Sequence, residues 1–96
     1  MNEDAGAGES LGRYPMPPRD DPGYDLAAAH ALLRGADEGD TTSAESATGY
    51  FWADPALEPQ MRQLLAEAVE RGHERREQLA ERYLRAVDSS RDSPRR

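Results

Sequence analysis

The chain contains no cysteine, no lysine and no isoleucine, and it has a single tryptophan and a single phenylalanine. Without cysteine it forms neither a disulfide bond nor a cysteine-based metal site. Without lysine it cannot use Schiff-base or lysine-nucleophile chemistry. Its twelve basic residues are therefore all arginine, a bias that a GC-rich genome and selection against lysine would both produce.

Long apolar runs are absent as well. The mean hydropathy is -0.94, and no stretch approaches the roughly 18 apolar residues of a membrane-spanning helix. The first residues, Met1 to Asp4, are polar or acidic after the methionine and do not begin the hydrophobic segment of a secretion signal. We therefore expect a cytoplasmic protein that does not contact a membrane.

The net charge of -7 is distributed unevenly along the chain. Residues 1–54 contain 11 acidic residues and 3 arginines, a balance of -8, whereas residues 55–96 contain 8 acidic residues and 9 arginines, a balance of +1. Binding to nucleic acid requires a basic surface that neutralises phosphates. The charge distribution thus predicts that nucleic acid is not a partner.

Composition divides the chain into three parts, all of them helical or disordered. Residues 1–22 are acidic and rich in proline and glycine, which predicts a disordered tail. Residues 23–88 have the spacing of a small helical interaction module. The polar residues 89–96 predict a second disordered tail. The expected fold class is all-α, with a disordered N-terminus.

The first helix of the module is expected to be short. Three consecutive alanines favour a helix from Tyr24 to Arg34, and Gly35 is a usual residue for ending a helix. The glycine, threonine and serine content of residues 36–49 then predicts a flexible loop. Asp54 is placed to cap a loose turn that Pro55 opens.

The most informative segment is the amphipathic stretch from Pro59 to Val87. Its apolar residues form two patches on one face of a helix, separated by a polar stretch around Gly72. The pattern predicts one long C-terminal helix, with a possible break at Gly72, since glycine costs about 1 kcal/mol relative to alanine in a helix interior. The two patches exceed what the short first helix can cover, so we expect self-association or a partner protein.

Three aromatic residues precede this stretch and suggest where a partner binds. Because three consecutive side chains cannot all face one way, at least one is expected to stay available to another molecule. Tryptophan and tyrosine are also common among interface hot spots. The predicted partner-binding residues are Tyr50, Phe51, Trp52, Met61, Leu64, Leu65, Leu79 and Tyr83.

Glu70 and His73 form the one recognisable metal-ligand spacing, Glu-x-x-His, which di-iron helical bundles use in duplicate. The pair lies in a polar stretch rich in glutamate, where such spacing arises by chance. A metal-binding helical oligomer is therefore the alternative hypothesis and not the main one.

No motif for catalysis is present, and we expect neither enzymatic activity nor a cofactor. The sequence predicts a small acidic helical protein that acts by protein–protein interaction, as an adaptor, accessory subunit or regulator. Besides the metal-binding oligomer, a further alternative is a precursor peptide that is modified between Thr41 and Trp52. The sequence does not identify the partner, the oligomeric state or the pathway.

Overall fold

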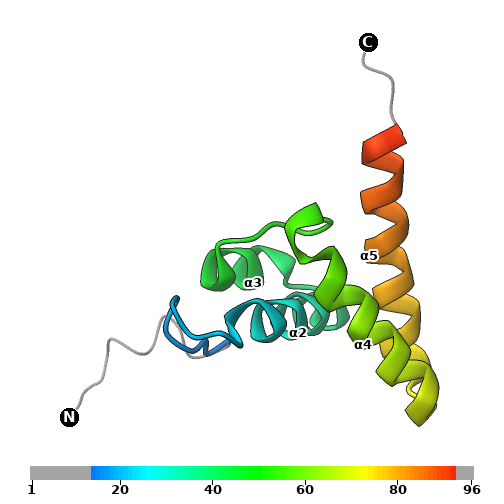
Figure 1. Ribbon diagram of the computed structural model, residues 1–96, viewed down its shortest axis with the longest axis horizontal. Coiled ribbons are helices and arrows are strands. Elements are labelled where there is room, and N and C mark those ends of the chain that lie inside the picture. The colour runs from blue at the N-terminus through cyan, green and yellow to red at the C-terminus, as the bar shows by residue number, and fades with distance from the viewer. Residues whose placement is uncertain (1–13, 93–96) are drawn as a thin grey trace.

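The computed structural model describes residues 14–92, and within this range the chain is helical and contains no strand (Figure 1). The prediction of an all-α fold is confirmed. The helical elements, in chain order, are α2 (Tyr24–Glu38), α3 (Thr41–Thr48), the single 3-10 turn η1 (Pro55–Leu57), α4 (Glu58–Arg71) and α5 (Glu74–Asp92).

The chain folds back at Gly72, so the expected long C-terminal helix is two helices. Gly72 ends α4 in the left-handed conformation, with φ of 71°, and its N–H and that of His73 satisfy the last carbonyls of α4. α5 then returns along α4 (Figure 1). The alternative that the sequence left open, a break at Gly72, is the arrangement that the structure has.

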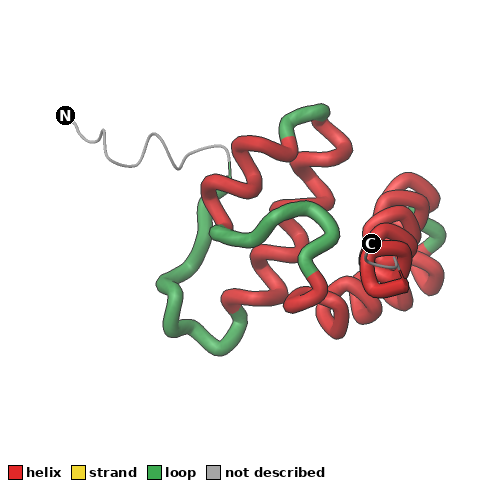
Figure 2. The backbone as a smooth tube through the Cα atoms, turned by 90° about the horizontal axis from the view of Figure 1, so that it is seen from above, coloured by secondary structure: helices red, strands yellow, loops and turns green. Residues whose placement is uncertain are grey.

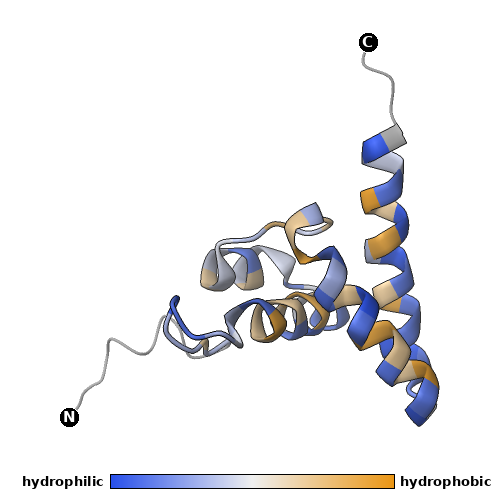
Figure 3. Ribbon diagram, viewed as in Figure 1, coloured by the Kyte–Doolittle hydropathy of each residue, from blue (hydrophilic) through white to orange (hydrophobic). Residues whose placement is uncertain are grey.

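The helical hairpin of α4 and α5 is completed by α2, which contacts both of its helices, while α3 packs mainly on α2 (Figure 2). Apolar residues of all these elements meet in one core, and the outer sides of the helices are mostly hydrophilic (Figure 3). The largest fully buried apolar side chains are those of Leu32, Leu57, Met61, Leu64, Leu79, Tyr83 and Val87. The two apolar patches of the C-terminal stretch therefore cover each other.

Residues 36–38 belong to α2 and residues 41–48 form α3, so the prediction of a flexible loop over residues 36–49 is wrong. Gly35 lies inside α2, where a Cβ atom would come within 2.8 Å of the Cβ of Ala44. It serves the close approach of α2 and α3 rather than ending the helix. The stop is Gly39, with φ of 75°, and Asp40 then caps α3 by accepting a hydrogen bond from the Ser43 N–H at 3.3 Å.

The predicted tails are only partly tested. Residues 14–22 have a defined conformation, with Tyr14 in the core and Met16 packed against it, so the prediction of disorder is wrong for this part. Tyr14 is 2% exposed, and its hydroxyl donates a hydrogen bond of 2.6 Å to Glu38. At the other end, residues 89–92 continue α5. Residues 1–13 and 93–96 lie outside the described residues.

The turn before α4 follows its prediction closely. Asp54 accepts a hydrogen bond of 3.0 Å from the N–H of Ala56, and Pro55 opens η1. Pro59 occupies the first turn of α4, where its missing N–H removes no helical hydrogen bond. The local signals of aspartate and proline are sufficient to place this junction.

Candidate functional site

The described residues offer no obvious metal centre. Across residues 14–92 there is no group of three or more histidine, cysteine, aspartate or glutamate side chains arranged to hold an ion. Glu70 and His73 are both exposed, and the break at Gly72 puts them on different sides of the turn. The Glu-x-x-His spacing thus does not form the helical ligand pair that the alternative hypothesis requires.

Between Tyr14 and Asp92, none of the helices combines the length and the apolar character that crossing a membrane requires.

Half of the predicted partner-binding residues are in the core. Met61, Leu64, Leu79 and Tyr83 are almost completely buried, because the hairpin turns their faces toward each other and toward α2. Leu65 is half-buried at the edge of this core. The prediction that these faces bind another molecule assumed a straight rod, and the folded hairpin leaves Met61, Leu64, Leu79 and Tyr83 almost no exposed surface.

The aromatic loop, residues 49–54, behaves differently because hydrogen bonds rather than burial fix its backbone. The Thr48 hydroxyl, fully buried, accepts from the Tyr50 N–H at 3.1 Å and lies 3.2 Å from the Tyr50 carbonyl oxygen. The carboxylate of Glu45 accepts from the Trp52 N–H at 2.8 Å, and the Asp54 N–H donates to the Phe51 carbonyl at 3.0 Å. The loop is therefore held at both ends and at its centre.

Ala53 adds a sign of strain to this loop. Its φ of 72° lies in the left-handed region, and it is the one described residue other than glycine that adopts a positive φ. For a residue with a Cβ this conformation costs about 1–2 kcal/mol. Strained backbone of this kind persists where the surroundings enforce it and is frequent at functional sites.

The first and last aromatic side chains of the loop are anchored. The Tyr50 hydroxyl donates a 2.6 Å hydrogen bond to the Asp25 carboxylate, and this bond, followed by burial, raises the pKa of Tyr50 above its ordinary value. The Trp52 ring meets the ring of Tyr83 edge to face, with centroids 4.8 Å apart. Both contacts tie the loop to the helices beneath it.

Tyr83 links the loop to the core by a second contact. Its hydroxyl donates a 2.8 Å hydrogen bond to the Asp54 carbonyl. Burial, together with the negative charge of Asp54, raises the pKa of Tyr83, so the phenol remains a neutral donor at physiological pH.

Phe51 is the exception among the three aromatics. Its side chain is 56% exposed, although it is the only phenylalanine in the chain and sits between two anchored neighbours. The other large exposed apolar side chain in the described range is Val69, also 56% exposed, in the last turn of α4 next to Gly72. Val69 thus lies at the C-terminal end of α4, whereas Phe51 lies in the loop that precedes η1 and α4.

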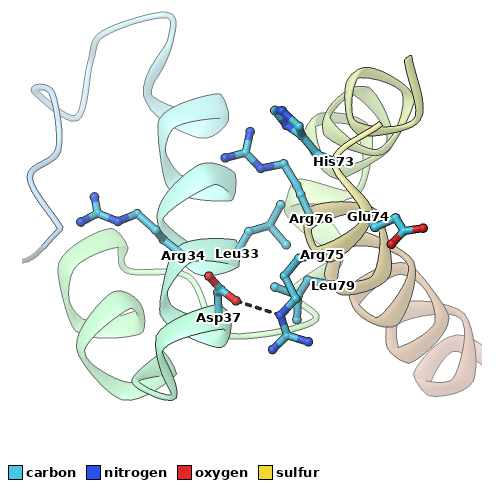
Figure 4. A pocket seen from close by; sticks show the side chains of 8 residues that line it. All are labelled: Leu33, Arg34, Asp37, His73, Glu74, Arg75, Arg76 and Leu79. Atoms are coloured by element: carbon cyan, nitrogen blue, oxygen red, sulfur yellow. Dashed lines mark hydrogen bonds and ion pairs between the residues drawn. The ribbon is translucent and has the colours of Figure 1, made fainter. Parts of the chain in front are cut away.

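A hollow of about 410 Å³ lies between the C-terminal half of α2 and the start of α5 (Figure 4). We call it the α2/α5 hollow. Its lining residues are Leu33, Arg34, Asp37, His73, Glu74, Arg75, Arg76 and Leu79. Sequence reasoning missed it, because the turn at Gly72 is what brings the polar residues after it next to α2.

Comparison of the chain with protein-family models, with curated proteins and with solved structures finds no match.

Proposed function

We propose that this chain is a non-catalytic interaction module that binds a partner protein through the aromatic loop, with Phe51 as the anchor. The observation that carries the proposal is the exposure of Phe51 on a loop whose backbone is held in place by hydrogen bonds. Burial of a large apolar side chain is favourable by about 1.5–3 kcal/mol relative to exposure. The exposed Phe51 does not contribute this free energy to folding. Insertion into a partner would recover that free energy.

The rigidity of the loop supports this proposal. A side chain on a loop that is already ordered loses little conformational entropy on binding, and this saving raises affinity. The ties from Thr48, Glu45 and Asp25 provide such order without covering Phe51. A loop that served only to connect α3 to α4 would not require a strained residue such as Ala53.

The charges around the loop indicate the kind of partner surface. Asp25, Glu45 and Asp54 belong to the loop's hydrogen-bond network, and Arg19, which lies over the ring of Tyr24, is the basic residue close to it. This acidic excess favours a partner with an apolar pocket rimmed by basic residues.

The test uses affinity purification from the native organism with quantitative mass spectrometry. Wild-type chain, Phe51→Ala and Val69→Ala serve as baits, and Val69→Ala is the matched control because it removes an equally exposed apolar side chain. Phe51→Ala should lose the specifically enriched partner, with a binding cost of about 2 kcal/mol or more, as for a hot spot. Val69→Ala should retain it.

Equal recovery of the same proteins by Phe51→Ala and wild type would overturn the proposal. Sedimentation of the purified chain separates a second possibility, that the partner is another copy of this chain. A dimer that Phe51→Ala dissociates and Val69→Ala does not would place the same loop in a homodimer interface.

A further inference from the structure

The α2/α5 hollow has an apolar floor and a charged rim. Leu33 and Leu79 form the floor and are almost completely buried, whereas the residues from His73 to Arg76 are exposed around it. Electrostatic attraction is stronger next to an apolar surface than in bulk water. The charged residues of the rim would thus attract a charged ligand on this floor more strongly than they would attract a ligand on an open helix surface.

Arg75 is held in position by Asp37. The Nε atom of Arg75 donates to Oδ1 of Asp37 across 2.8 Å, joining α5 to α2 (Figure 4). Because this bond uses Nε, both terminal Nη groups keep N–H donors for another acceptor. An ion pair between two side chains this exposed contributes little to stability, about 0–1 kcal/mol. Its clearer effect is to fix a guanidinium at the hollow.

Arg76 brings a second positive charge to the same space. Its side chain extends from α5 toward α2 (Figure 4), and within residues 14–92 no carboxylate forms an ion pair with it. Its charge also reaches the half-buried His30, whose pKa is lowered first by burial and next by Arg76.

The remaining charged groups leave this arrangement intact. The Glu74 carboxylate points away from the hollow in Figure 4, and the Arg34 guanidinium lies over the ring of Tyr14, with its carbon 5.5 Å from the ring centroid. Asp37 and Arg75 neutralise each other, so Arg75 offers N–H donors and Arg76 supplies the positive charge left unpaired among the described residues. In addition, the first turn of α5 begins at the hollow, and the amide N–H groups of a first helical turn favour an anion.

We propose that the α2/α5 hollow binds a small organic oxyanion, a carboxylate or phosphate that carries a compact apolar group. Arg75 and Arg76 bind the anionic oxygens, and Leu33 and Leu79 contact the apolar group. This site is separate from the aromatic loop and does not depend on the function proposed for it.

The experiment is a titration of isotope-labelled full chain followed by NMR. The probes are isovalerate, isobutyl phosphate, inorganic phosphate and the neutral isovaleramide. The first two should shift the amides of Leu33, Arg75 and Arg76 saturably, with millimolar dissociation constants. Inorganic phosphate should bind more weakly because it lacks the apolar group, and isovaleramide should cause no saturable shift.

The two organic anions also distinguish the source of the oxyanion. Stronger binding of isovalerate assigns the site to carboxylates, and stronger binding of isobutyl phosphate assigns it to phosphate esters. Absence of saturable binding by both, or equal shifts from isovaleramide, would overturn the proposal.

Variants test whether the named residues form the site. Arg76→Gln should weaken binding of the preferred anion about tenfold, the effect of losing one hydrogen bond to a charged group. Arg82→Gln is the matched control, since Arg82 lies on the same helix, is exposed and does not line the hollow. Unchanged affinity in Arg76→Gln would contradict the assignment.

Discussion

The α4–α5 hairpin and the aromatic loop both carry apolar residues, but they use them in opposite ways. In the hairpin, residues from both apolar patches are buried against each other and against α2. In the loop, polar ties from Thr48, Glu45 and Asp25 fix the chain while Phe51 faces solvent. The amphipathic pattern of the C-terminal stretch thus identifies residues that the fold buries, whereas Phe51 remains exposed on a loop that hydrogen bonds hold in place.

The two regions also differ in what stabilises them. Each fully buried large apolar side chain of the hairpin contributes about 1.5–3 kcal/mol relative to exposure. A typical hydrogen bond of the loop contributes a net of about 0.5–1.5 kcal/mol, and the strain at Ala53 offsets part of that sum. Substitutions in the hairpin should therefore be measured as stability, and substitutions at Phe51 as binding.

The largest expected effect is the loss of a core side chain in the hairpin. Leu64→Ala removes a fully buried side chain and should destabilise the fold by about 2–5 kcal/mol. A domain of this size has little more than that in total, so urea denaturation should show a chain that is largely unfolded. Val69→Ala is the control on the same helix and should cost less than about 0.5 kcal/mol. Similar midpoints for the two variants would show that Leu64 is not in a core.

A smaller effect is expected where the two regions join. Tyr83→Phe keeps the edge-to-face contact with Trp52 but removes one of the two donors to the Asp54 carbonyl, which still accepts from the Leu57 N–H at 3.1 Å. We expect a loss of about 0.5–1.5 kcal/mol, the net contribution of one hydrogen bond, measured by urea denaturation and by the fluorescence of Trp52, the only tryptophan. An unchanged unfolding midpoint would indicate that the loop is not coupled to the hairpin through this bond.

The ion pairs at the start of α4 predict a small dependence of stability on pH. Hydrogen bonds from Arg91 and then Arg62 lower the pKa of Glu58 below its ordinary value. The resulting stabilisation is present above the unfolded-state pKa of a glutamate, about 4.3, and is lost as the pH falls through the lower folded-state pKa. Glu58→Gln should therefore lose stability at neutral pH and approach wild type in acid. Glu70→Gln, on the same helix, is the control. An identical dependence of stability on pH for both variants would show that the ion pairs of Glu58 do not cause the effect.

The smallest expected effect on stability is at the loop tip. Phe51→Ala should change the free energy of unfolding by no more than about 0.5 kcal/mol, because the side chain is mostly exposed. Thermal melting followed by circular dichroism checks this. A loss above about 2 kcal/mol would show that Phe51 supports the fold, and its effect on binding would then need another explanation.

Much of the helical pattern was readable from the sequence, and the reasons for the errors are physical. Local signals placed the start of α2 at Tyr24 and the capped turn at Asp54. The error at Gly35 arose because a glycine can end a helix or let another helix approach, and the distance to Ala44 that distinguishes the two is set by tertiary structure. The polar composition of residues 41–48 likewise concealed a short helix that is stabilised by packing against α2.

The candidate site was predicted in part. The aromatic triplet drew attention to the loop for which we propose a binding role, but nothing in the sequence distinguishes Phe51 from its neighbours, since the anchors for Tyr50 and Trp52 come from distant residues. The inclusion of Leu79 and Tyr83 followed from treating the C-terminal stretch as one rod. The left-handed conformation of Gly72 makes the C-terminal stretch a hairpin and not one helix. The periodicity of the apolar residues alone does not reveal this conformation.

The stability of Gly72→Ala tests the central claim, that the chain folds back and covers its own apolar faces, most directly. No other atom lies within 4 Å of the position of an added Cβ, so the effect reports the backbone conformation alone. With φ of 71° at this residue, urea denaturation should show a loss of about 1–2 kcal/mol, as it should for the control Gly39→Ala, which also has a positive φ and open space. A continuous helix predicts the opposite sign, a gain of about 1 kcal/mol, and a Gly72→Ala variant that is more stable than wild type would contradict the account.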